Sequence, residues 1–188
     1  TSGAAHQHLA KGFTIGMRFH SAPVIRLADA KPVELGHAVE ADGRWRIFAF
    51  ADRSDPAGPD SALFRLCEFL DISNKSPLRR YTPEGEDPDS VIDFRAVFQQ
   101  GHRDLAVGRM HPLLLPPKGR FGLFDYEKMF CADAPGDIFD RRGIDRDKGC
   151  MVVVRPDQYV ASILPLDAHD RLTALFDGFM PARDRPVD

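Results

Sequence analysis

The sequence predicts an α/β fold in which a mixed central sheet is flanked by helices. Three stretches indicate a βαβ unit: an apolar run at residues 45–51, an amphipathic segment at 61–72 and an alternating segment at 91–100. Two strands of one sheet joined through a helix form a right-handed crossover. Residues 149–179 then add a strand, a turn, a second strand and a helix.

The two strands of the crossover differ in pattern. Residues 45–51 are apolar on both faces except at Arg46, which is typical of a strand in the middle of a sheet. Residues 91–100 alternate, with Asp93 and Arg95 on one side and four apolar positions on the other. These four positions are Ile92, Phe94, Ala96 and Phe98.

The segment between these strands carries an apolar stripe with helical spacing, at i, i+3, i+4 and i+7. The stripe consists of Leu63, Leu66, Cys67 and Leu70. Asp60 or Ser61 is expected to cap its start, because a side-chain oxygen there accepts a hydrogen bond from a free backbone N–H group. The polar residues 74–90, rich in Pro and Gly, are expected to form a surface loop.

The last part of the chain is expected to form a hairpin followed by a helix. Pro156 suits the second position of a type I turn, because its ring presets φ. Asp167 and Asp170 resemble a capping box at the start of the final helix. The apolar stripe of that helix comprises Ala168, Leu172, Leu175, Phe176 and Phe179.

Shorter elements complete the expected domain. They are strands at 24–27, 33–39 and 119–125 and a short helix within 135–145. The expected division is a linker or extended arm at 1–23, one domain at 24–180 and a tail at 181–188. Strand, helix, strand, short helix, strand, strand and helix is the order of elements in the thioredoxin fold.

Thiol chemistry is not expected despite this order. A thioredoxin-like redox protein has a reactive cysteine where the first central strand meets the first helix, because the helix N-terminus stabilises the thiolate. Residues 51–64 hold no cysteine, residues 145–150 lack the proline found before the last hairpin, and the chain has no C-x-x-C. The three widely spaced cysteines, Cys67, Cys131 and Cys150, fit a reducing cytoplasm, and burial is expected for Cys67 and Cys150.

The composition favours neither nucleic acid nor membrane as a partner. Apolar residues make up 43% of the 188 residues, and the formal charge of −3 lacks the basic excess typical of nucleic-acid binding. No apolar run approaches the ~20 residues that a membrane-spanning helix needs.

We expect no catalytic, cofactor-binding or metal-binding residue in this chain. It contains no G-x-x-x-x-G-K-[ST], no G-x-G-x-x-G and no G-x-S-x-G. Asp125 and Glu127 are interpreted as solvated carboxylates. The histidines are too scattered for the spacing of a metal site. They are His6, His8, His20, His37, His102, His111 and His169.

Seven aromatic residues leave two interpretations open. They line a pocket for an apolar ring, or they fill the core between sheet and helices. The residues are Trp45, Phe48, Phe50, Phe94, Phe98, Phe121 and Phe124.

Three motifs occur in order along the chain: GMRF at 16–19, DGRWR at 42–46 and RPDQYV at 155–160. Together they resemble the C-terminal domain of the phenol hydroxylase family of FAD-dependent aromatic monooxygenases, over nearly the whole chain. The resemblance implies a thioredoxin-like domain without redox cysteines that takes part in a homodimer. It places FAD and the NADPH-dependent chemistry in preceding domains of the same chain, and the first residue, which is not Met, fits a domain boundary.

The resemblance further implies a parent flavoprotein that hydroxylates a phenolic substrate in aromatic compound catabolism. Residues 19–39 favour the 3-hydroxybenzoate 4-hydroxylase type over phenol hydroxylase itself. The contact between subunits is expected from exposed apolar residues of the arm and of the last hairpin. Two other hypotheses are a free-standing, redox-inactive thioredoxin-like binding module and a cysteine-dependent peroxidase or reductase.

Overall fold

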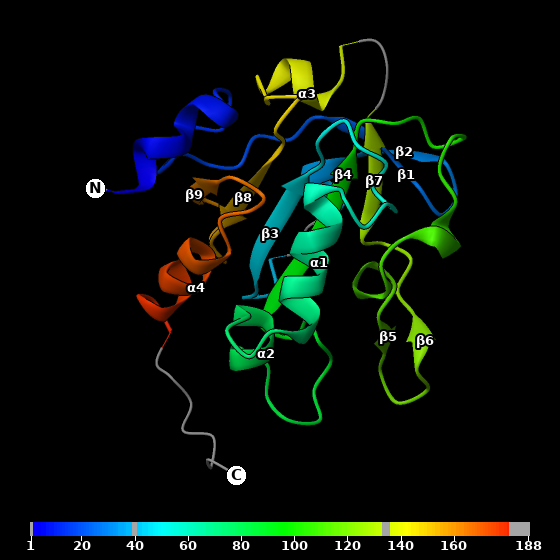
Figure 1. Cartoon of the computed structure of the whole chain (residues 1–188), viewed down its shortest axis with the longest axis vertical. Coiled ribbons are helices and arrows are strands. Elements are labelled where there is room, and N and C mark those ends of the chain that lie inside the picture. The colour runs from blue at the N-terminus through cyan, green and yellow to red at the C-terminus, as the bar shows by residue number, and fades with distance from the viewer. Residues whose placement is uncertain (1, 39–40, 133–135, 181–188) are drawn as a thin grey trace.

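The structure of the chain, a computed structural model, describes residues 2–38, 41–132 and 136–180. Its strands form a seven-stranded sheet in the order β2-β1-β7-β4-β3-β8-β9 and a separate hairpin of β5 and β6 (Figure 1). The strands are β1 (Pro23–Arg26), β2 (Lys31–Glu34), β3 (Trp45–Phe50), β4 (Ile92–Phe98), β5 (Pro117–Lys118), β6 (Leu123–Phe124), β7 (Met129–Ala132), β8 (Cys150–Val154) and β9 (Val160–Leu164). The α-helices are α1 (Ala62–Ile72), α2 (Pro77–Tyr81), α3 (Ile138–Arg141) and α4 (His169–Asp177), and the 3-10 helices are η1 (Ser2–Leu9), η2 (Leu35–Ala38), η3 (Val107–Arg109) and η4 (Pro112–Leu114).

The sheet is mixed, as the sequence predicts. β4 runs parallel to both β3 and β7, while the other neighbouring pairs are antiparallel. The predicted βαβ crossover is β3, α1 and β4. Ser61 caps α1 by accepting a hydrogen bond from the backbone N–H of Phe64 at 3.0 Å, which confirms one of the two predicted caps.

The helices α1, α2 and α4 cover one face of the sheet, which we call the first face (Figure 1). The predicted apolar stripe of α1 is fully buried there. Burial of one such aliphatic side chain stabilises the fold by about 1.5–3 kcal/mol. Phe176 of α4 lies edge-on to the ring of Trp45 at 5.4 Å, and Phe179, which follows α4, stacks on the same ring at 5.3 Å.

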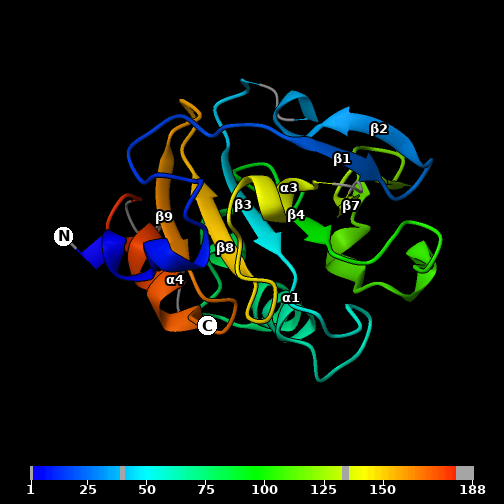
Figure 2. The same cartoon turned by 90° about the horizontal axis from the view of Figure 1, so that it is seen from above.

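The N-terminal segment and α3 cover part of the opposite face, which we call the second face (Figure 2). Leu9 and Phe13 pack there with Phe139 of α3. The backbone N–H of Gly12 donates to the carbonyl of Arg142 at 2.8 Å, and a Cβ atom on Gly12 would lie 2.6 Å from the Cα atom of Arg142. This close approach requires glycine.

Residues 2–22 are more ordered than the linker or extended arm expected of them. They begin with η1 and continue along β9, the last strand of the sheet. The backbone N–H of Gly16 donates to the carbonyl of Val160 at 2.9 Å, and the N–H of Val160 donates to Met17 at 2.9 Å. The segment therefore pairs with the start of β9. Its connection to a preceding domain stays a prediction, and residue 1 and the expected tail at 181–188 lie outside the described residues.

Other local expectations were wrong in detail. The surface loop expected at 74–90 contains α2, whose Leu78 and Tyr81 are buried against α1 and α4. The strand β7 was not predicted. The capping box does not form, because α4 begins after Ala168 without a side-chain cap. Of the two strands expected at 33–39 and 119–125, the first is β2 followed by η2, with residue 39 outside the described residues, and the second is only the two-residue β6.

The hairpin of β8 and β9 confirms the turn predicted at Pro156. The N–H of Gln158 donates to the carbonyl of Arg155 at 2.9 Å, and Gln158 has φ of 68°. A type I turn followed by a left-handed residue is a common connection in hairpins. Among the described residues, no helix combines the length and the hydropathy needed to cross a membrane.

Candidate functional site

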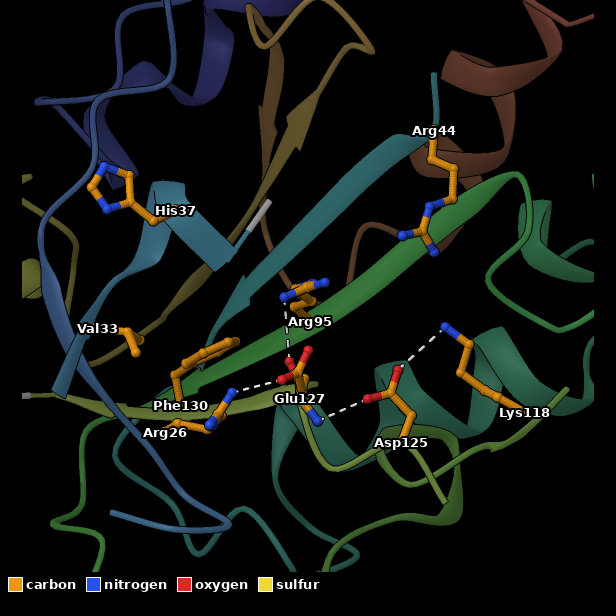
Figure 3. Close-up of a pocket in the computed structure, with 9 residues that line it drawn as sticks. All are labelled: Arg26, Val33, His37, Arg44, Arg95, Lys118, Asp125, Glu127 and Phe130. Carbon is orange, nitrogen blue, oxygen red and sulfur yellow. Dashed lines mark hydrogen bonds and ion pairs between the residues drawn. The ribbon is translucent and has the colours of Figure 1, made fainter. Parts of the chain in front are cut away.

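A charged cavity of about 370 Å³ opens on the second face, beside the hairpin of β5 and β6 (Figure 3). Side chains of β1, β2, β4 and β7 and of the segments around them converge on it. Its lining consists of Arg26, Val33, His37, Arg44, Arg95, Lys118, Asp125, Glu127 and Phe130.

Side chains alternate between the two faces along β4, and this determines where the charged residues of the site lie. Ile92, Phe94, Ala96 and Phe98 pack in the core of the first face, so Asp93 and Arg95 lie on the second face. Arg46 of β3 lies opposite Asp93 in the parallel register. The sequence prediction for Asp93 and Arg95 is thus confirmed as to face, although both side chains are buried.

Lys128, directly before β7, joins two buried carboxylates. Its Nζ atom lies 2.5 Å from Oδ1 of Asp93 and also contacts Oδ2 of Asp89. Asp89 Oδ2 further accepts from Lys118 Nζ at 2.9 Å and from Arg44 Nη1 at 3.0 Å. Because an unpaired buried charge is strongly destabilising, each member of this network requires the others.

The network lowers the pKa values of its carboxyl groups. Burial alone would raise the pKa of Asp89, but the positive charges of Lys128 and Lys118 lower it to about 2. Burial would likewise raise the pKa of Asp93, and the cations Lys128 and Arg95 outweigh that effect and lower it. Both groups are therefore ionised at neutral pH, as ion pairing requires.

At the rim of the cavity, Arg26 Nη1 lies 2.6 Å from Oε1 of Glu127, and the two side chains point toward one another in Figure 3. Glu127 is 63% exposed, as expected of a solvated carboxylate. That expectation was wrong for Asp125, whose side chain is only 14% exposed and lies 3.4 Å from Lys118 Nζ. Asp125 belongs to the ionic network.

The cations of the cavity lining are paired with carboxylates. The pairs are Arg26 with Asp29, Arg44 with Asp42, Arg95 with Asp93, and Lys118 with Asp89. Such a surface presents both signs of charge at short range. It is suited to contact with another mixed-charge protein surface more than to the capture of a free anion.

The cysteines lie in surroundings that disfavour thiolates. Cys67, Cys131 and Cys150 are fully buried. Burial raises the pKa of each thiol, to about 12 for Cys131. At the start of α1, where a redox protein of this fold would place its cysteine, Ser61 acts as a helix cap. Since the thiolate is the reactive form, this arrangement argues against redox chemistry at these three positions.

Three of the histidines lie in different surroundings. His111 Nδ1 accepts a hydrogen bond from the N–H of Leu113 at 3.1 Å and so caps η4, and His169 stacks on Phe69 at 4.5 Å. His37 lines the charged cavity. Within the part of the chain that the structure describes, no group of three or more His, Cys, Asp or Glu side chains is placed to hold a metal ion.

The aromatic residues fill two separate cores. Phe94 and Phe98 pack on the first face, whereas Phe48 and Phe50 pack on the second. They cannot line one pocket together, and the core interpretation holds for these four. Phe121 and Phe124 are exposed on the hairpin of β5 and β6.

Sequence analysis missed Lys128 as the common partner of Asp93 and Asp89. Lys128 lies 35 residues from Asp93 and 39 residues from Asp89 along the chain, and no local pattern joins them. A usable signal was the pair of charges Asp93 and Arg95 inside a strand flanked by apolar residues, because such charges require buried partners.

The whole fold resembles proteins of the thioredoxin class. Peroxidoxin BcpB from Mycobacterium tuberculosis superimposes with a TM-score of 0.53 and 14% identity, covering 90% of this chain and 99% of that one. The thioredoxin domain of a thiol-disulfide oxidoreductase from Bacteroides vulgatus gives a TM-score of 0.52 at 12% identity, covering 88% and 97%. At these identities the likeness concerns the fold alone, and it confirms the thioredoxin-like prediction.

Sequence comparison extends the likeness to a family. The family model described as "Phenol hydroxylase, C-terminal dimerisation domain" matches residues 1–184. The chain is 57% identical over 185 residues to a 3-hydroxybenzoate 4-monooxygenase of Comamonas testosteroni, covering 97% of this chain and 29% of the relative. It is 30% identical over 184 residues to the FAD-dependent monooxygenase terD of Aspergillus terreus, covering 95% and 30%. The chain thus spans less than a third of the length of these relatives.

Proposed function

Because the chain belongs to the family of phenol hydroxylase C-terminal dimerisation domains, we propose that it is the non-catalytic C-terminal part of an FAD- and NADPH-dependent aromatic hydroxylase. The parent enzyme hydroxylates a phenolic substrate, with 3-hydroxybenzoate as the first candidate. The observation that carries the proposal is the 57% identity to a 3-hydroxybenzoate 4-monooxygenase over almost the whole chain.

In this proposal the flavin supplies the oxygen chemistry from a preceding part of the same polypeptide. The absence of a G-x-G-x-x-G motif from these 188 residues supports that division. The residues described above contribute architecture: two packed cores, one on each face of the sheet, and a buried ionic network that fixes the strands relative to the β5–β6 hairpin.

We further propose that the parent enzyme is a cytoplasmic homodimer. The family description supports a dimer. The three buried, unpaired cysteines are compatible with a reducing compartment.

The proposal is tested with the full-length protein that the gene encodes. We expect bound FAD, and NADPH oxidation that 3-hydroxybenzoate stimulates and that yields a dihydroxybenzoate, measured by absorbance and by chromatography of the product. Phenol serves as the comparison substrate. A protein without flavin, or a reading frame confined to these residues, would favour the free-standing binding module instead.

A further inference from the structure

The β5–β6 hairpin carries an exposed apolar patch. Four of the eight large hydrophobic side chains that are exposed among the described residues lie within residues 121–126. They are Phe121, Leu123, Phe124 and Tyr126, with exposed fractions of 78%, 71%, 59% and 50%. Exposed apolar groups concentrated in so short a segment are typical of a contact surface.

The hairpin is held firmly at its base. Lys118 Nζ lies 2.9 Å from Oδ2 of Asp89, and the N–H of Gly119 donates to Oδ1 of Asp87 at 3.0 Å. The N–H of Asp125 donates to the carbonyl of Pro116 at 2.9 Å. The network around Asp89 thus fixes the hairpin, which stands apart from the seven-stranded sheet in Figure 1. A surface held in place before binding loses less conformational entropy when it binds.

The edges of the main sheet are poor alternatives for association. The N-terminal segment already hydrogen-bonds to Val160 at the start of β9, so part of that edge is occupied. The opposite edge strand, β2, exposes Lys31 and Pro32. Lysine and proline are residues that protect edge strands from pairing. The arm and the last hairpin, from which a subunit contact was expected, expose one large apolar side chain each, Met17 and Tyr159, against four on the β5–β6 hairpin.

We propose that the β5–β6 hairpin, together with the charged rim of the cavity beside it, is the surface on which a second copy of this chain docks. The inference rests on the proposed dimeric function and names the surface that carries it. In a two-fold contact each copy presents the same patch to the other. An apolar patch complements itself, and a rim such as Arg26 with Glu127 offers both signs of charge to its own copy.

The test compares two double variants of the full-length protein by sedimentation velocity across a dilution series. Phe121→Ser with Leu123→Ser removes the two most exposed apolar side chains of the hairpin. Met17→Ser with Ile72→Ser, at 53% and 67% exposure, is the matched control away from the hairpin. We expect the hairpin variant to weaken dimerisation by at least about 100-fold in Kd, as loss of two interface anchors would, while the control matches the wild type.

The outcomes separate this inference from the proposed function. A wild type that is dimeric and a hairpin variant that stays dimeric would overturn the inference and leave dimerisation intact. A hairpin variant that stays dimeric but loses bound flavin would assign the hairpin to the preceding domains and also overturn it. A monomeric wild type would contradict the dimeric function itself.

A second measurement does not depend on how the double variant folds. A short bifunctional maleimide should join two copies of the Leu123→Cys variant and should not join copies of the Ile72→Cys variant. The three natural cysteines of this segment are fully buried and do not compete, and the unaltered full-length protein gives the background from any others. Equal cross-linking of the two variants would count against the hairpin.

Discussion

The ammonium group of Lys128 lies 2.5 Å from the carboxylate of Asp93, and both side chains are buried on the second face of the sheet. Lys128 precedes β7 and Asp93 belongs to β4, so the pair spans two neighbouring parallel strands. The same ammonium group contacts Asp89, which holds the base of the exposed hairpin. One buried cation therefore connects the central sheet to the proposed docking surface.

Replacing Lys128 by Met should destabilise the domain strongly. Asp93 and Asp89 would lose their nearest cation while remaining buried, and breaking a buried pair in this way costs about 3–5 kcal/mol. Urea denaturation measures the free energy of unfolding. The control is Lys75→Met, because Lys75 pairs with Asp170 at the surface with 71% and 86% of the side chains exposed. That change should remain within about 1 kcal/mol of the wild type, and equal losses in the two variants would contradict the role of Lys128.

Acid should destabilise the domain partly through Asp89. Its pKa in the folded state is about 2, below the ordinary value of 3.8, so the folded state binds this proton less readily than the unfolded state. The stabilisation is therefore complete above the ordinary pKa and is lost as the pH falls from about 4 to about 2.

Asp89→Asn tests this dependence by urea denaturation at several pH values. The variant should be less stable than the wild type at neutral pH, and the difference should shrink across that acid window. The exposed Asp60 supplies the control variant, Asp60→Asn, which should keep the acid sensitivity of the wild type. A constant difference between Asp89→Asn and the wild type at every pH would refute the linkage.

Gly149→Ala should be more damaging than Gly43→Ala. Both glycines have positive φ, 61° and 81°, which costs a residue with a Cβ atom about 1–2 kcal/mol. At Gly43 the new Cβ atom would meet nothing within 4 Å. At Gly149 it would overlap the carbonyl oxygen of Phe50 and lie 2.9 Å from the backbone N of Asp52, which adds about 1–3 kcal/mol. Thermal and urea unfolding should show a larger loss of stability for Gly149→Ala than for Gly43→Ala. The reverse result would show that the backbone around Gly149 shifts to accommodate the new Cβ atom.

The natural cysteines should react slowly with a thiol reagent in the folded protein. Cys67, Cys131 and Cys150 are buried and their thiol pKa values are raised by that burial. Labelling should therefore require unfolding, whereas a cysteine introduced at the exposed Ile72 should react at once. Rapid labelling of the unaltered protein would revive the hypothesis of a cysteine-dependent peroxidase or reductase.

Local periodicity was sufficient to predict the centre of the fold. Three patterns each predict a single kind of element: the apolar run of β3, the apolar stripe of α1 and the alternation of β4. The structure contains all three elements. The strand β7 was missed because its four residues, Met129–Ala132, are too few for a period to show and include no β-branched residue. The helix α2 was missed because only three residues, Pro77, Leu78 and Tyr81, mark its buried side within a polar segment.

The candidate site was less predictable than the fold. The pairing of Lys128 with Asp89 and Asp93 depends on tertiary structure that brings three segments together, and a single sequence does not encode that in any local spacing. The exposure of Phe121 was missed because sequence analysis applied a general tendency of aromatic residues. An aromatic residue near a strand is ordinarily buried, and only the short, separate β5–β6 hairpin leaves it in solvent.

The hydrogen bonds of residues 9–19 have a mechanical consequence. The N–H of Gly12 donates to Arg142 next to α3, and Gly16 and Phe19 donate to Val160 and Gln158 in the last hairpin. A force applied at the N-terminal end of the chain would act directly on these hydrogen bonds, because the segment is bonded to the domain along its length. In the proposed parent enzyme, movement of the preceding domain would therefore be transmitted directly into the sheet.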